Sequence, residues 1–433
     1  MKKVLMIGMI FCAMLLIIGC TGNGEEDNGG SGNGDEAVTL TLLIDNQSAQ
    51  EGIIAVADEI EERYNITTEI EIRPGGDEGD NIVRTRLATG VMSDLVFYNS
   101  GALFAALEPE NFFVDITDES FMQYIDDGFR LATTVDGQSF GIPAQYAMGG
   151  GWLYNRRVYE ELGLSVPNTW EELMANNQVI YDAGLTPVIA SFADSWTAQL
   201  VVLADYYNVY MQESDFADRF TANEASTADS AALRSFERLY ELGQSGFFNS
   251  DLMATTYDDA LQLLATGQGA HYPMLSFALA QVAELFPDYV DDIGIFGQPG
   301  DGGHDRGLTM WTPAGIYLNA DSPYREAQLQ WASFFASPEG AEIFMAAQSP
   351  DGPIAITGVS MPDDILPAVQ DMQVYIEAGR TVPALEFLTP LKGPSLEQIL
   401  VEVGMGITSA VAGAEAYDLD VEMQATQLGL EGW

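Results

Sequence analysis

The sequence predicts an α/β protein made of two lobes. Segments with strand-like and helix-like patterns alternate along the chain, which favours parallel strands joined by helical crossovers. The chain from Val38 to Trp433 also exceeds the roughly 250–300 residues that one hydrophobic core usually holds. We therefore expect two lobes, each consisting of a sheet flanked by helices.

The first expected element is a strand over 38–44, which ends at a polar stretch beginning with Asp45. Ser48 and Glu51 predict a capping box, since their hydroxyl and carboxylate groups can bond free amides at a helix start. Apolar residues at helical spacing predict the buried face of that helix. They are Ile53, Ile54, Ala57 and Ile60.

The alternation continues with a strand over 67–72, a helix over roughly 81–89 and a strand over 94–98. Ligands in parallel sheets gather at the carboxyl ends of strands. In this chain those ends carry polar residues at 45–48 and 98–100.

A second unit is expected after Gly-Ile-Pro at 141–143. Three glycines at 149–151 precede a strand over 152–154. The glycines fit either a place where the backbone rotates, because Gly tolerates unusual φ and ψ, or a tight turn entering the strand. Thr169 and Glu172 predict a second capping box.

The remaining elements of the second unit follow the same helical and strand patterns. Ser337, with proline at 338, predicts the start of one further helix. The other expected helices cover 157–162, 231–243, 257–266 and 324–335, and a further strand covers 316–318.

The N-terminal region predicts export and lipid attachment. Lys2 and Lys3 precede an uncharged apolar run, and Gly19 stands before Cys20, an arrangement that resembles a bacterial lipobox. The apolar run is shorter than the ~20 residues of a spanning helix, so we expect residues 1–19 to be cleaved as a lipoprotein signal peptide. Residues 20–37 would then form a lipidated, flexible, acidic and Gly-rich linker. The protein is expected to be extracytoplasmic and anchored to the membrane through Cys20.

Cysteine use and charge exclude several classes of function. The chain has two cysteines, Cys12 in the signal and Cys20 at the lipidation site. No thiol would then remain for catalysis, for a zinc site or for an iron–sulfur cluster. The 65 acidic residues face only 16 basic ones, so nucleic acid is repelled as a partner.

Short motifs recur in a definite order along the body. The segment 137–173 contains Gly-Ile-Pro at 141–143, Tyr-Asn at 154–155, and Pro-Asn-Thr-Trp-Glu-Glu-Leu at 167–173. Further motifs stand at 183–187, 246–249, 257–263, 267–270, 292–294 and 337–340. Together they resemble family 1 of the bacterial extracellular solute-binding proteins of sugar ABC importers, which is maltose-binding-protein-like.

The resemblance implies a periplasmic-binding-protein-like fold, in which two hinge-linked lobes hold a ligand in the cleft between them. Lobe I is then expected over 38–143 plus 314–355, and lobe II over 144–313 plus 356–433. Crossings between the lobes are expected near 144–148, 309–313 and 353–359. The family's function would be to capture a carbohydrate, here an oligosaccharide, by lobe closure and to deliver it to ABC permease subunits. We expect a monomer, no cofactor and no enzymatic activity.

A sugar presents apolar C–H faces and a rim of hydroxyls, so its site needs aromatic surfaces with a few donors and acceptors. The resemblance points to Trp196, to Phe277, where relatives commonly have Trp, and to Trp311 on the second crossing. Gly307 and Pro313 on either side of Trp311 argue against a regular buried strand there. Trp152, Trp170 and Trp331 lie at periodic positions and are expected in the core.

Polar partners for the sugar are expected at strand ends and crossings, because carboxylate and amide groups can bond adjacent hydroxyls. Asp194 is the leading candidate, since the resemblance pairs it with Trp196. The other candidates are Asp45, Asn46, Gln47, Tyr98, Asn99, Gln145 and Tyr146.

Two alternatives from other classes stay open. A cleft with aromatic and acidic residues also suits a polyamine or another cation. A secreted glycoside hydrolase is less favoured, because carboxylate pairs are uninformative among so many acids and only His271 and His304 could serve as catalytic histidines. The segment 300–305 lacks the carboxylate spacing of a calcium loop and is expected to be a surface turn.

The charge imbalance predicts that salt stabilises the fold. Lysine occurs only at Lys2, Lys3 and Lys392, and the formal net charge is −49. We expect adaptation to a saline or alkaline habitat, where ions screen self-repulsion within about 10 Å at 0.1 M salt. The melting temperature should therefore rise between low and molar NaCl; an unchanged or falling value would contradict the hypothesis.

Overall fold

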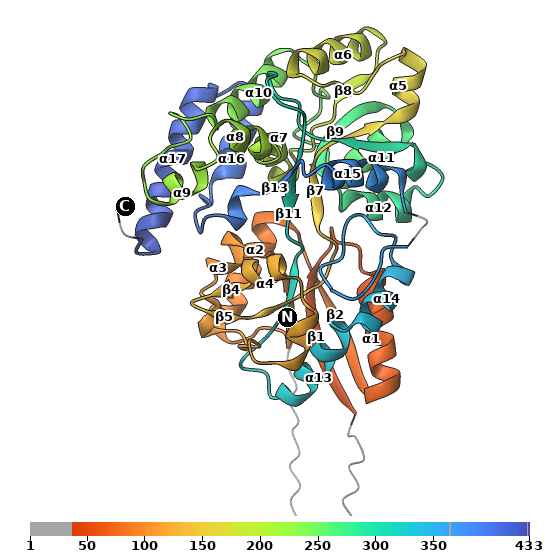
Figure 1. The fold of residues 1–433 in the computed structure, drawn as a ribbon, viewed down its shortest axis with the longest axis vertical. Coiled ribbons are helices and arrows are strands. Elements are labelled where there is room, and N and C mark those ends of the chain that lie inside the picture. The colour runs from red at the N-terminus through yellow and green to blue at the C-terminus, as the bar shows by residue number, and fades with distance from the viewer. Residues whose placement is uncertain (1–36, 363–364, 431) are drawn as a thin grey trace, which may run out of the picture. The chain divides into compact units, whose positions relative to one another are not determined.

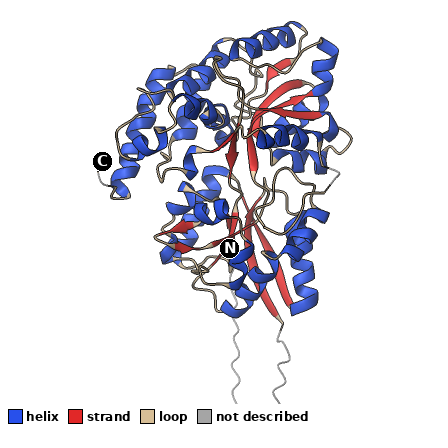
Figure 2. Cartoon of the chain, viewed as in Figure 1, coloured by secondary structure: helices blue, strands red, loops and turns tan. Residues whose placement is uncertain are grey.

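The computed structural model describes residues 37–433 apart from 363–364 and 431, and two β-sheets with their helices organise it (Figures 1 and 2). The predicted signal peptide, the lipidation site Cys20 and the linker up to Glu36 lie outside the described residues. In the described part, no helix combines the length and the apolar character needed to cross a bilayer.

The first sheet has five strands in the order β2-β1-β3-β12-β6. β1 pairs in parallel with β2 and β3, as the alternating pattern predicts, whereas β12 is antiparallel to both β3 and β6. The strands are β1 (Val38–Asp45), β2 (Ile66–Arg73), β3 (Leu95–Tyr98), β6 (Gly141–Pro143) and β12 (Gly315–Leu318).

Helices cover both faces of this sheet because successive side chains of β1 point to opposite sides. Leu42 and Ile44 pack in one cluster with residues of α1 (Glu51–Tyr64), α13 (Arg325–Phe335) and α14 (Pro338–Ala347). Leu43 packs on the other face with residues of α2 (Gly76–Thr89) and α3 (Ala102–Ala105).

Two expectations for the first lobe are wrong. Ser48 and Glu51 form no capping box: α1 begins at Glu51 after Gln50, and Ser48 Oγ instead donates to Asp45 Oδ2 at 3.1 Å. Helix α2 also begins at Gly76, earlier than the apolar spacing indicated, because its first turn is polar and glycine-rich.

The second sheet has the order β13-β11-β7-β9-β8, and β10 pairs with β7 off this path. The long strand β7 is antiparallel to β9, β10 and β11, so it forms the centre of this sheet. The strands are β7 (Met148–Asn155), β8 (Thr186–Val188), β9 (Gly269–Leu275), β10 (Ile293–Phe296), β11 (Leu308–Trp311) and β13 (Thr381–Pro383).

Helices also pack on both faces of the second sheet. In Figure 1 the C-terminal helices α16 and α17, drawn in blue, lie beside α10, and their residues share one core cluster. The helices are α5 (Arg156–Leu162), α6 (Trp170–Asp182), α7 (Leu200–Leu203), α8 (Tyr206–Gln212), α9 (Phe216–Thr221), α10 (Leu233–Gln244), α11 (Tyr257–Thr266), α12 (Ala278–Leu285), α15 (Pro367–Glu377), α16 (Leu396–Gly404) and α17 (Ala410–Gln427).

Short elements complete the described chain. They are α4 (Asp127–Ala132), the hairpin of β4 (Thr134–Val135) and β5 (Gln138–Ser139), and the 3₁₀ turns η1 (Pro109–Asn111), η2 (Ser120–Tyr124), η3 (Ser195–Gln199), η4 (Val290–Asp292) and η5 (Leu385–Phe387).

Several local predictions are confirmed. Thr169 and Glu172 form the expected capping box at the start of α6, and Ser337 Oγ accepts from Gly340 N at the start of α14. Trp152, Trp170 and Trp331 lie in the core with exposures of 0%, 4% and 0%.

The chain crosses between the two sheets where β6 leads to β7 and where β11 leads to β12. The crossing segments bond to one another: Ala144 N donates to Ala314 O at 3.0 Å, and Ala147 N donates to Pro353 O at 2.6 Å. The segment that contains Pro353 therefore lies against the first crossing.

Candidate ligand-binding site

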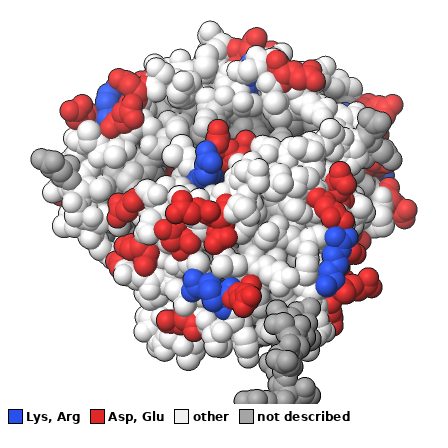
Figure 3. All heavy atoms as spheres, turned by 60° about the horizontal axis from the view of Figure 1, so that its bottom comes forward, with Lys and Arg blue, Asp and Glu red and all other residues white. Residues whose placement is uncertain are grey.

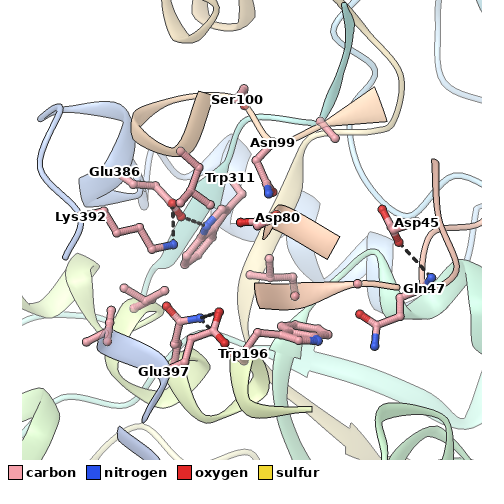
Figure 4. Close-up of a pocket in the computed structure, with 18 of the residues that line it drawn as sticks. Asp45, Gln47, Asp80, Asn99, Ser100, Trp196, Trp311, Glu386, Lys392 and Glu397 are labelled. Carbon is pink, nitrogen blue, oxygen red and sulfur yellow. Dashed lines mark hydrogen bonds and ion pairs between the residues drawn. The ribbon is translucent and has the colours of Figure 1, made fainter. Parts of the chain in front are cut away.

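A cavity of about 240 Å³ lies where strand ends of the first sheet meet loops of the second (Figure 4). Its volume is near the lower end of the ~300–1,000 Å³ of small-molecule sites. Its polar and charged lining residues are Asp45, Gln47, Ser48, Arg73, Asp80, Arg84, Asn99, Ser100, Gln145, Gln199, Thr312, Glu386, Lys392, Glu397 and Gln424. Its aromatic lining residues are Phe97, Trp196, Phe277, Trp311 and Phe387.

One wall carries the predicted aromatics Trp196 and Phe277. Their ring centroids are 6.1 Å apart with an interplanar angle of 33°. The buried ring of Tyr257 supports both, 5.5 Å from Trp196 and stacked 5.8 Å from Phe277. The indole Nε1 of Trp196 has no hydrogen-bond partner among the described residues. Two half-buried aromatic rings thus share one wall of the cavity on a rigid base.

Trp311 lines the same cavity from another side, but its local structure differs from the expectation. It is the last residue of β11 and only 6% exposed, so it does lie in a regular buried strand despite the nearby Gly307 and Pro313. Its Nε1 donates to Glu386 Oε1 at 2.6 Å, and Glu386 Oε2 accepts from Lys392 Nζ at 2.7 Å (Figure 4).

This tryptophan explains the central glycine of the run in β7. Gly149 to Gly151 lie within the strand, and none of the three has a positive φ. A Cβ on Gly150 would lie only 2.2 Å from the Trp311 ring, at Cζ3. Gly150 is therefore needed for close approach of the indole rather than for backbone rotation or a tight turn. A Cβ on Gly151 would instead lie 2.5 Å from the backbone oxygen of Phe296, and one on Gly149 would lie 2.9 Å from Met372 Cε.

Four of the predicted polar candidates line the cavity: Asp45, Gln47, Asn99 and Gln145. The carboxylate of Asp45 is already engaged, accepting from Gln47 N at 2.9 Å and from Ser48 Oγ. The amide groups of Gln47 and Gln145 are half-buried at the cavity wall.

The other four polar candidates do not line the cavity, and three of them bond protein groups: Asp194, Asn46 and Tyr146. Asp194 accepts from Gln47 Nε2 at 3.0 Å and from Tyr257 N at 2.7 Å, which joins a loop of the second sheet to one of the first. Asn46 accepts from Gly75 N at 3.1 Å. Tyr98 and Tyr146 are fully buried, and burial raises the pKa of both phenols.

Sequence reasoning missed the C-terminal contribution to the cavity. Glu386, Lys392 and Glu397 lie far along the chain from every motif that drew attention to the site. One signal was present: Lys392 is the only lysine after residue 3. Asp80 and Arg84 of α2 were also missed: Asp80 lies before the start of the expected helix, and Arg84 lies within it but was not singled out.

The histidines do not contribute to this cavity. His271 is buried in β9, where its Nε2 lies 2.6 Å from Tyr159 Oη, and burial lowers the pKa of its imidazole to about 4. His304 lies in the turn at 300–305, whose Asp301 pairs with Arg234 at 3.0 Å. Within the described ranges, no group of three or more His, Cys, Asp or Glu side chains could hold a metal ion.

The sequence and the fold match a known class of proteins. The sequence profile of the family described as "bacterial extracellular solute-binding protein" matches residues 45–342, more than half of the chain. The chain therefore belongs to the bacterial extracellular solute-binding proteins. Its fold, with two lobes, sheets flanked by helices and a cleft between them, is the one that the sequence predicts.

Individual relatives agree with this assignment. The multiple sugar-binding protein of Streptococcus mutans serotype c is 22% identical over 309 residues, 69% of this chain and 70% of that protein. A chitin oligosaccharide binding protein has a similar fold, with a TM-score of 0.76, 20% identity and coverage of 91% of this chain and 99% of the other. The solute-binding protein RafE in complex with raffinose also has a similar fold, with a TM-score of 0.72 and 20% identity. That similarity covers 88% of this chain and 98% of the other.

We expect Gly150→Ala to disturb the Trp311 ring, since the added Cβ would meet rigid ring atoms. The variant should lose roughly 1–3 kcal/mol of stability and show an altered near-ultraviolet circular dichroism spectrum. Gly149→Ala is the matched control, because its Cβ would meet only the flexible end of Met372 at 2.9 Å. Equal effects of the two substitutions would contradict the role assigned to Gly150.

Proposed function

We propose that this protein is the substrate-binding lipoprotein of an ABC importer. Its proposed ligand is a neutral carbohydrate, specifically an oligosaccharide. The observation that carries the proposal is that two aromatic walls line one cavity. Trp196 and Phe277 form one wall and Trp311 forms the other, and amide side chains line the same cavity. Aromatic faces can stack on the C–H surfaces of sugar rings, while amides and carboxylates bond the hydroxyls. The sugar-binding names of several relatives support the same ligand class.

Charge at the cavity favours a neutral ligand over a cation. The chain as a whole has 65 acidic and 16 basic residues, and on the face shown in Figure 3 the few basic side chains lie beside acidic ones. The cavity differs, because its acids and bases nearly balance. The acids are Asp45, Asp80, Glu386 and Glu397, and the bases are Arg73, Arg84 and Lys392. A polyamine site would be expected to keep an excess of unpaired acids.

The proposed mechanism is capture by lobe closure. Lobe I comprises 38–143 plus 314–355 and lobe II comprises 144–313 plus 356–433 in this proposal. A ligand that contacts groups from both lobes favours the closed arrangement by its additional contacts there. Gln47 Nε2 donates to Asp194 Oδ1 at 3.0 Å, which is the kind of contact between the lobes that the proposed opening would break. The closed form would then deliver the sugar to permease subunits in the membrane to which Cys20 is anchored.

The ligand class is tested by titrating the protein with mono- to tetrasaccharides in high salt. Binding is measured by intrinsic tryptophan fluorescence and by thermal shift. We expect at least one neutral oligosaccharide to bind, and Trp311→Ala to weaken it by roughly tenfold or more, equivalent to about 1.4 kcal/mol. Trp433→Phe is the control, since Trp433 does not line the cavity and its Nε1 donates to Thr221 O at 2.9 Å. A response to spermidine with none to any neutral sugar would overturn the proposal in favour of a cation.

Membrane attachment is tested separately. Cys20→Ala should release the protein from the membrane fraction into the soluble fraction, because the thiol that carries the lipid is lost. Its affinity for the sugar should not change, since the lining residues all lie beyond position 44. Retention of the Cys20→Ala protein in the membrane fraction would contradict lipid anchoring at this residue.

A further inference from the structure

Two carboxylates from one short C-terminal segment reach the cavity, and each bonds the element that carries a different tryptophan. The segment runs from η5, which starts at Leu385, to the first turn of α16 at Glu397. Glu386 bonds Trp311 directly, whereas Glu397 bonds the turn that carries Trp196 (Figure 4). The segment 385–397 thus connects the two aromatic walls of the cavity.

The contact at Trp311 is buried and charge-assisted. The side chains of Glu386 and Lys392 are 9% and 12% exposed, and their ion pair is 2.7 Å long. A buried carboxylate is costly unless it is paired and hydrogen-bonded, and Lys392 together with the indole N–H supplies both partners. The indole is further confined on the opposite side by Gly150, where only a hydrogen fits. The ring of Trp311 therefore has its orientation set from two directions.

Glu397 does not bond Trp196 directly but bonds other residues of the turn η3, which carries Trp196. Glu397 accepts from Ser195 Oγ at 2.8 Å and from Gln199 Nε2 at 3.1 Å, the first and last residues of that turn. Gln199 Nε2 also donates to Trp196 O at 3.2 Å. One carboxylate thereby ties both ends of the turn together while Trp196 projects from its middle.

We propose that Glu386 and Glu397 are positioning residues that set the angle and spacing between the two aromatic walls, and that Lys392 keeps Glu386 in place. The inference rests on the proposed function, because it concerns how the sugar rings would be held. Glu386 acts on the ligand through Trp311, since its Oε1 and Oε2 bond the indole and the ammonium group. The segment 385–397 then determines which ring geometry the cavity accepts.

A double-mutant cycle separates this role from direct ligand contact. Glu386→Gln removes the charge that pairs with Lys392 and should weaken oligosaccharide binding by roughly tenfold in the wild-type background. In a Trp311→Phe background, which has no indole N–H, the same substitution should change affinity less than about twofold. An equal loss in both backgrounds would mean that Glu386 contacts the ligand itself, and it would overturn the proposal.

The second carboxylate is tested in the same way. Glu397→Gln should weaken binding in the wild type and have little effect in a Trp196→Ala background. Glu402→Gln is the matched control on the same helix α16, because Glu402 bonds Thr408 Oγ1 on the exposed surface. All affinities are measured at a temperature where thermal melts show every variant to be folded, so that loss of stability is not read as loss of positioning.

A measurement without ligand keeps this test independent of the proposed function. The near-ultraviolet circular dichroism of tryptophan should change in Glu386→Gln and in Lys392→Met, and should stay unchanged in Glu402→Gln. If no sugar binds the wild type but these spectra differ as expected, the ligand assignment fails and the positioning role stands. If the spectra of Glu386→Gln and wild type coincide, the positioning role of Glu386 is overturned.

Discussion

The arrangement of this protein depends on the hydrogen-bonded contact between the segments that cross from one sheet to the other. Ala144 bonds Ala314, and Ala147 bonds Pro353, so three parts of the chain that are distant in sequence meet at one place. Ser100 at the end of β3 joins them through Pro313 O at 2.9 Å. The bonds of Ala144 and Ala147 join backbone groups, so they hold the ends of both sheets together with little dependence on side-chain identity, whereas Ser100 contributes through its hydroxyl. The cavity lies beside them, and Gln145 and Thr312 line it directly from the crossings.

Packing at that place explains features that look unrelated along the chain. Gly150 of β7 creates room for the Trp311 ring, and the only lysine in the described residues pairs with the carboxylate that bonds its indole. In a chain with net charge −49, a lysine that is nearly buried in a cavity is there for a specific partner rather than for solubility. The chain as a whole is strongly acidic, whereas the numbers of acidic and basic residues that line the cavity are nearly equal.

Much of the fold could be predicted from local patterns. The helix starts at Thr169 and Ser337 were predicted correctly, because a cap depends on residues within one turn. The core positions of Trp152, Trp170 and Trp331 followed from periodicity. Prediction failed where another partner competed: Asp45 bonds the Ser48 hydroxyl that was expected to cap α1. The polar first turn of α2 carried no apolar periodicity, so its start at Gly76 was not visible.

The sequence by itself determined the class of fold and the aromatic residues Trp196, Phe277 and Trp311 that line the cavity. These are properties of local pattern and of motif order, which the linear chain contains. Only the tertiary structure decided which polar groups remain at the cavity, since Asp194, Asn46, Tyr98 and Tyr146 are taken up by bonds to protein groups or by burial. It also brought Glu386 to Trp311 across 75 positions and Glu397 to Ser195, the neighbour of Trp196, across 202 positions. No local pattern encodes such pairs, because they arise only when the crossings bring the C-terminal segment back to the cleft.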